Sequence, residues 1–352
     1  MSQSYFTFPN IDEENVWSIA TISKNIITRL EIYIRSATST DLKQLLTSLP
    51  HTMEYLHFSL CYLDSDISQT LVDCLSNHPS TQSFEMNKYR KIGVEEMYFI
   101  STLLSLPNVE KFEISSNYIG IEQTRIFAQA LGNSTLKELI FSWNSIGDGG
   151  VSNLAQALEA NHSLRILDCG MNGISSKGFY PLAETLKINS TLLEIQLHWN
   201  NLGSQGAELL AQVIKQNKSL VRIFIPRNKI GDIGVDAIAD ALQYNDTLEM
   251  IDLRYNGISK QGLRYLRDSF QKNKTLRQMD LDETCDKDIF KILTRDIQQL
   301  LKRNERILQS QCKITGIQIF ETFAQRLHKD IEYYLLPSLI FPMIGLSSMK
   351  IL

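Results

Sequence analysis

A motif that recurs every 28 residues is the feature that most constrains the fold of this chain. Its last position is an asparagine, found at Asn144, Asn172, Asn200, Asn228 and Asn256, with Asn117 lying 27 residues before the first of them. In the segment Leu136–Asn144, apolar residues occupy the first, fourth and sixth positions and asparagine occupies the ninth. A fixed period of this length indicates a solenoid, in which each repeat is one structural unit stacked on its neighbours.

The same frame continues in weaker form in both directions. It is found at Ile27–Arg35, Met53–Cys61, Thr81–Tyr89, Val109–Asn117 and Leu276–Thr284. Apolar residues still fill most of the apolar positions in these segments, and Thr81 is the clearest departure. We therefore expect ten strand segments between residues 27 and 284.

The chemistry of each position predicts the structure of one repeat. The short apolar alternation predicts a strand with its apolar residues facing inward. The asparagine side chain can donate to and accept from backbone groups where the chain leaves the strand. The next apolar residues recur at helical spacing and predict the buried face of a helix, as at Val151, Leu154, Ala155 and Leu158. Stacking then buries the apolar face that one repeat cannot cover alone.

These repeats resemble the ribonuclease-inhibitor type of leucine-rich repeat, over residues 27–284. That group includes ribonuclease inhibitor, the repeats of NOD-like receptors and the Ran GTPase-activating protein, and similar repeats occur in effectors of intracellular bacteria such as Legionella. The resemblance implies an α/β fold, a horseshoe-shaped solenoid with a parallel concave sheet and convex helices. It specifies function weakly, because one scaffold serves many partners.

The two ends of the chain lie outside the repeats. We expect residues 1–26 to form an N-terminal cap, with Asp12 capping a short helix and apolar residues covering the first strand, namely Phe6, Phe8, Val16, Trp17, Ile19 and Ile22. Residues 285–334 are expected to form a helical C-terminal cap. It is expected to contain two amphipathic helices. The apolar face of the first consists of Ile289, Leu293, Ile297, Leu300 and Leu301, and that of the second consists of Ile319, Phe323, Leu327, Ile331 and Tyr334. Capping repeats are normally atypical.

Residues 335–352 form an apolar tail with two prolines and a single charge at Lys350. Three interpretations remain open for it. The tail packs on the cap or is poorly ordered, it contacts a membrane, or it is a C-terminal secretion signal as the Legionella resemblance implies. The prolines interrupt it too much for a membrane-spanning helix.

Composition restricts the class of partner and the compartment. A net charge of −4 and a pI near 5.9 give no reason to expect nucleic-acid binding. No signal peptide is recognisable at the start, so we expect a cytoplasmic protein. Five dispersed cysteines without metal-ligand spacing agree with a reducing compartment, and Cys169 occupies an apolar strand position expected in the core. The Asn-X-Ser/Thr triplets recur with the repeat, so we interpret them as structural turns rather than glycosylation sites.

Two columns of residues are expected on the exposed face of the strands. The first lies between the second and third apolar positions and reads Glu31, His57, Glu85, Glu113, Ile140, Asp168, Gln196, Phe224, Asp252 and Asp280. Six of these ten residues are acidic. One interpretation is a solvated polar face, and the other is an acidic groove for a partner with a basic surface, which would gain attraction and association rate.

The second column lies just before the asparagine and contains Trp143, Met171, Trp199, Arg227 and Tyr255, with Ile140, His198 and Phe224 beside it. These residue types dominate interface hot spots. The rings either pack against neighbouring strands and serve only the fold, or form a binding patch. We favour the patch, because exposed rings are costly without a use. A partner would then insert between Trp143 and Tyr255 and place basic residues near Glu113, Asp168 and Asp252.

Catalytic motifs are not recognisable in this sequence. It has no phosphate-binding glycine loop, no nucleophile turn, and no histidine or cysteine spacing typical of a metal site. We therefore expect a monomeric, non-enzymatic protein-binding module without cofactor or metal, acting as a secreted bacterial effector in a host cytosol. The alternative is a regulator of a small GTPase or an intracellular sensor or adaptor, in which Arg227 would act on a nucleotide.

Overall fold

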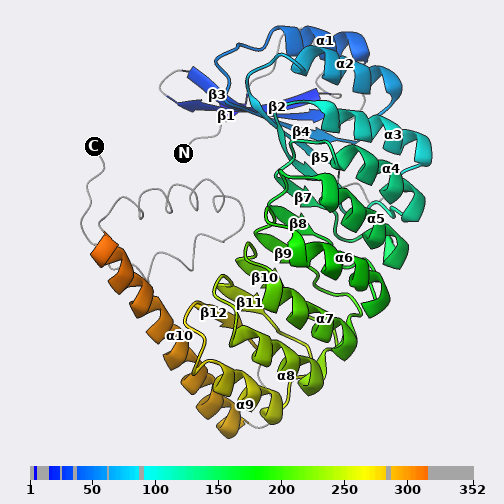
Figure 1. Ribbon diagram of the computed structural model, residues 1–352. Helices are drawn as coiled ribbons and strands as arrows, with labels where there is room; N and C mark the ends of the chain where they lie inside the picture. The colour runs from blue at the N-terminus through cyan, green and yellow to red at the C-terminus, as the bar shows by residue number, and fades with distance from the viewer. Residues whose placement is uncertain are drawn as a thin grey trace. The chain divides into compact units, whose positions relative to one another are not determined.

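The computed structural model describes residues 4–5, 16–23, 26–34, 38–61, 63–86, 91–282 and 287–315. The chain divides into two units, residues 1–301 and residues 302–352. The first contains one sheet with helices packed along one of its faces (Figure 1). Within the second, the described residues are 302–315, which form the C-terminal part of one helix.

The sheet has twelve strands in sequence order. They are β1 (Ser4–Tyr5), β2 (Val16–Ser23), β3 (Ile26–Ile34), β4 (Tyr55–Leu60), β5 (Thr81–Glu85), β6 (Val109–Glu113), β7 (Glu138–Ile140), β8 (Ile166–Asp168), β9 (Glu194–Gln196), β10 (Arg222–Phe224), β11 (Met250–Asp252) and β12 (Gln278–Asp280). From β3 to β12 all neighbours are parallel, which confirms the ten predicted strand segments. From β7 onward each residue pairs with the residue one repeat later, as Ile166 pairs with Glu194.

A helix follows each strand from β3 onward and, up to α9, returns the chain to the start of the next strand. The helices are α1 (Ser39–Thr47), α2 (Ser65–Leu75), α3 (Val94–Thr102) with the 3-10 turn η1 (Leu103–Ser105), α4 (Ile121–Leu131), α5 (Gly147–Ala160), α6 (Ser176–Ile188), α7 (Gly203–Gln216), α8 (Gly231–Leu242), α9 (Lys260–Ser269) and α10 (Lys287–Thr315). The predicted buried face of α5 is confirmed, because Val151, Leu154, Ala155 and Leu158 are all buried. The chain is therefore a leucine-rich-repeat solenoid.

The core lies between the sheet and the helices. Apolar strand positions and the inner helix faces meet there, and the largest buried side chains are phenylalanines. In the N-terminal half, Phe58, Phe84, Phe112, Phe127 and Phe141 form a continuous row with ring centroids 5.1–5.8 Å apart. Such rows add to burial because offset and edge-on ring pairs attract one another.

The asparagines of the 28-residue motif form a ladder of hydrogen bonds along the solenoid. The Asn200 side-chain amide donates to the carbonyl oxygens of Cys169 and Leu197, both at 3.0 Å. Its Oδ1 accepts from the backbone N–H groups of Asn172 at 3.1 Å and Ile174 at 2.9 Å. The predicted double role of this side chain is confirmed, and Asn200 ties its own repeat to the preceding one.

A second set of asparagines ends the helices. Asn161, Asn217, Asn245 and Asn273 are each at most 6% exposed. In each, the amide donates to a carbonyl of the preceding repeat, as Asn217 does to Leu186 at 2.7 Å. A buried amide used in this way cannot carry a glycan, so the structural interpretation of these four triplets is confirmed.

The N-terminal segment contains two strands that the repeat pattern does not predict. β2 pairs antiparallel with β3 over its whole length, and β1 pairs antiparallel with β2. These strands extend the sheet beyond the first repeat. Phe6, Phe8 and the proposed cap Asp12 lie outside the described residues, as do the expected second C-terminal helix and the tail.

Candidate interaction surface on the strands

The residue before each ladder asparagine has the same unusual backbone conformation. Ser116, Trp143, Met171, Trp199, Arg227 and Tyr255 have φ angles between 52° and 61°. We call this set the turn column. Non-glycine residues rarely occupy this left-handed region, which costs roughly 1–2 kcal/mol per residue. At Trp143, Met171 and Trp199, the backbone N–H still donates to the next repeat, at 2.8–3.0 Å. The stacking of repeats therefore imposes this conformation.

The turn column carries large side chains into solvent. Trp143 is 55% exposed, Trp199 48% and Tyr255 53%, and Arg227 is exposed as well. Met171 is half-buried. Surfaces of this kind mark interaction sites when several such residues gather, whereas single exposed rings are ordinary. The structure thus brings five predicted residues onto one line along consecutive repeats.

Arg227 is held between two aromatic rings. Its Cζ lies 4.0 Å from the ring centroid of Trp199 and 4.2 Å from that of Tyr255. A guanidinium over an aromatic face is attracted by the ring quadrupole, by about 0.5–1 kcal/mol at an exposed site. The two rings therefore help to fix each other and the arginine between them.

The first predicted column is less exposed than the sequence suggested. Ile140 and Asp168 are 7% exposed and Asp252 is 1% exposed, while Phe224 is half-buried. The strand alternation places these residues on the face opposite the helices, yet three of the four are buried there. Glu113 remains partly exposed and lies 3.9 Å from Lys111 Nζ, measured from its Oε2.

Asp252 is neutralised within its own strand segment. Arg254 donates from Nη2 to Asp252 Oδ2 at 2.6 Å and from Nε to both carboxylate oxygens at 3.0 and 3.1 Å. This hydrogen bonding raises the pKa of the Arg254 guanidinium, an effect that burial opposes. The carboxylate is therefore paired with Arg254 and buried, whereas the residue pattern predicted it on the exposed face. Asp252 ends β11, and Arg254 lies two residues further on, in the turn that follows the strand.

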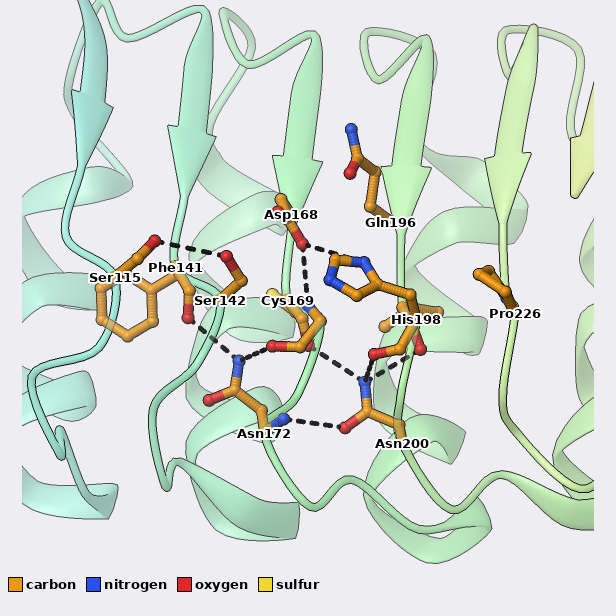
Figure 2. A network of polar contacts seen from close by, with 12 residues as sticks. Ser115, Phe141, Ser142, Asp168, Cys169, Asn172, Gln196, His198, Asn200 and Pro226 are labelled. Carbon is orange, nitrogen blue, oxygen red and sulfur yellow. Dashed lines mark hydrogen bonds and ion pairs between the residues drawn. The ribbon is translucent and has the colours of Figure 1, made fainter. Parts of the chain in front are cut away.

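Asp168 sits in a polar network that includes His198 (Figure 2). Its Oδ1 accepts from the Gly170 N–H at 2.8 Å and lies 3.7 Å from His198 Nδ1. Burial raises the pKa of the Asp168 carboxyl, against the lowering effects of His198, of the Gly170 N–H and of Ser142. A Cβ at position 170 would overlap the imidazole of His198, so glycine is needed there for the ring to lie beside Asp168.

The part of the chain that the structure describes bears on two kinds of chemistry, metal binding and the reactivity of the buried Cys169 thiol. No group of three or more histidine, cysteine or acidic residues is placed to hold a metal there. Cys169 is fully buried, and burial raises the pKa of its thiol well above the ordinary value. Its predicted place in the core is confirmed. Among the described residues, no helix combines the length and apolar character needed to cross a membrane.

Two solved structures are similar to this chain in part. One is the actin-binding site 2 of leiomodin-1, with 16% identity and a TM-score of 0.41, covering 45% of this chain and 90% of that one. The other is the leucine-rich-repeat-containing protein LegL7 from Legionella pneumophila, with 14% identity and a TM-score of 0.42, covering 77% of this chain and 98% of that one.

Family comparison agrees with the repeats seen in the structure. Residues 132–155 and 189–211 match the family model described as leucine-rich repeat. The chain matches no curated protein. Like the strand-and-helix units and the asparagine ladder, these two matches agree with a leucine-rich-repeat fold.

Proposed function

We propose that this protein is a non-enzymatic binding module that recognises a protein partner through its turn column. The single observation that carries the proposal is the line of exposed side chains at Trp143, Trp199, Arg227 and Tyr255, which occupy four of five consecutive repeats. Tryptophan, tyrosine and arginine are the residues most enriched among interface hot spots. Each is also held in a backbone conformation that favours glycine, so the fold alone gives no reason for a bulky side chain there.

The setting that we propose is a secreted bacterial effector acting as a monomer in a host cytosol. This part rests on the resemblance of the repeats to effector repeats and on the apolar segment 335–352. Deletion of that segment tests it. Loss of translocation into host cells with unchanged folding supports the setting, whereas unchanged translocation contradicts a signal in the tail.

The binding proposal is tested by comparing three versions of the protein. The first is the wild type, the second is Trp143→Ala/Trp199→Ala, and the third is the control Tyr180→Ala. Tyr180 lies on α6 and is 55% exposed, so it matches the exposure of the tryptophans while lying on the helix side. Equal thermal unfolding of the three proteins is required first.

Affinity capture from cytosol should retain a partner with the wild type and the control but not with the double variant. With that partner purified, each tryptophan substitution should cost at least about 2 kcal/mol, roughly thirtyfold in Kd. Equal retention by all three proteins would place the binding surface elsewhere and reject the proposal.

A further inference from the structure

The chemistry around Arg227 indicates what kind of group the partner presents. Trp199 and Tyr255 cover the two faces of its guanidinium, at 4.0 and 4.2 Å from Cζ to each ring centroid. A guanidinium is planar and its five N–H donors lie in that plane. With both faces occupied, the donors are reached along the edge of the group.

Within the described part of the chain, the Arg227 side chain makes no hydrogen bond or ion pair. Carboxylates on the adjoining repeats are occupied by other donors: Glu194 by Arg222, Asp252 by Arg254 and Asp282 by the Tyr255 N–H at 2.7 Å. A stacked arginine that keeps its donors open is well placed to receive a planar anion, since carboxylates accept two parallel hydrogen bonds from one guanidinium.

A carboxylate fits this site better than a phosphate. Arg227 is the cation held between the two rings, whereas the Lys229 ammonium, two residues away, donates to the side chain of Asn201 at 3.2 Å. One guanidinium neutralises a carboxylate, whereas a phosphate monoester carries up to two charges near neutral pH. The net charge of −4 also opposes a polyanionic nucleic acid.

The rest of the turn column adds an apolar requirement. Trp143 and Met171 precede Trp199 by two repeats and one repeat, and Trp143 is 55% exposed. Three strand spacings separate Trp143 from Arg227, about 14 Å at roughly 4.8 Å per spacing. An extended segment covers that distance in about four residues at roughly 3.3 Å per residue.

From these observations we propose that Arg227, clamped by Trp199 and Tyr255, anchors an aspartate or glutamate side chain of the protein partner. A bulky apolar side chain about four residues away in the same segment packs on Trp143 and Met171. This inference rests on the proposed function and changes the expected partner chemistry at the turn column from basic to acidic.

The test uses immobilised short peptides with a fixed glutamate, a fixed leucine four positions further on, and otherwise randomised residues. Matched sets replace the glutamate by glutamine, lysine or phosphoserine. Each set is probed with the wild type, Arg227→Gln, Arg227→Glu, Trp143→Ala/Trp199→Ala and the control Tyr180→Ala, all checked for equal thermal stability.

The wild type and the control should bind the glutamate set at least tenfold better than the glutamine set. Arg227→Gln should lose that preference, and Arg227→Glu should prefer the lysine set. Stronger binding of the phosphoserine set, or a glutamate preference that persists in Arg227→Gln, would overturn the carboxylate inference.

The outcomes separate this inference from the proposed function. Loss of binding in Trp143→Ala/Trp199→Ala, without any glutamate preference in the wild type, keeps the binding surface and rejects the carboxylate anchor. Equal binding by all five proteins rejects both, whereas binding of no peptide set by any of them rejects the carboxylate anchor.

Discussion

Replacing Asn200 and Asn172 separately by alanine should have clearly different effects on stability, although both belong to the same ladder. Asn200→Ala removes hydrogen bonds to three backbone groups for which the structure provides no alternative partner among the described residues. These are the carbonyl of Cys169 and the N–H groups of Asn172 and Ile174. The carbonyl of Leu197 keeps a bond of 2.8 Å from Asn228.

Asn172→Ala leaves its backbone partners satisfied. The Asn172 amide donates to the carbonyls of Phe141 and Gly170, both at 3.0 Å. The Phe141 carbonyl also accepts from the Asn144 amide at 3.0 Å, and the Gly170 carbonyl from the Trp143 N–H at 3.0 Å. The buried Oδ1 of Asn172 has no hydrogen-bond partner among the described residues, so removing it costs nothing there.

The expected magnitudes follow from the unsatisfied groups. A buried backbone group without a partner costs about 1–3 kcal/mol, so Asn200→Ala should lower the free energy of unfolding by at least about 3 kcal/mol. Asn172→Ala should lower it by about 1 kcal/mol. Urea unfolding followed by far-ultraviolet circular dichroism measures both, and comparable m values would show that the same surface is exposed. Equal losses, or a larger loss for Asn172→Ala, would refute this account of the ladder.

Three further predictions concern single positions. Gly170→Ala should displace the His198 ring and destabilise the protein by about 1–3 kcal/mol, and a double-mutant cycle by urea unfolding should show that His198→Ala restores most of the loss. Met171→Gly should be about 1 kcal/mol more stable than Met171→Ala in the same assay, because φ is 52° there; the reverse order would contradict the imposed conformation. Burial and the neighbouring His51 lower the pKa of His78, whose ordinary value is about 6.5. The stability that neutral His78 contributes is therefore present above about pH 6.5 and is lost as the pH falls through the lower folded-state pKa. The urea concentration at the unfolding midpoint should be lower at about pH 5.5 than at about pH 7.5, and this difference should be smaller in His78→Gln.

The 28-residue period of the sequence predicted most of the fold. Spacing alone identified the ten strand segments, the buried helix faces and the ladder from Asn144 to Asn256, because the apolar alternation and the turn asparagine are local requirements of every repeat. The parallel arrangement of the strands was implied by the resemblance to leucine-rich repeats. The antiparallel strand β2 was missed, since Val16–Ser23 lies outside the period and has no turn signature.

The candidate site was predicted in position but not in chemistry. The repeat frame correctly placed Trp143, Trp199 and Tyr255, which lie just after its apolar positions, in solvent. It does not determine which neighbour neutralises a charge. Asp252 forms an ion pair with Arg254, two residues further on. Arg227 stacks on the rings of Trp199 and Tyr255, which lie 28 residues before and after it. Both contacts depend on side-chain conformations that a one-dimensional pattern does not contain.

The shared backbone of the turn column makes its side chains interchangeable in position. Every member has a φ angle between 52° and 61°, and the backbone hydrogen bonds of these residues do not involve their own side chains. Substituting one member changes the chemistry at one step along the solenoid while leaving the path of the chain in place. The aromatic–arginine–aromatic series at Trp199, Arg227 and Tyr255 can therefore be moved to other repeats by substitution. The substitutions Met171→Trp, Trp199→Arg and Arg227→Tyr would rebuild it one repeat earlier and move the anchoring point by about 4.8 Å, one strand spacing.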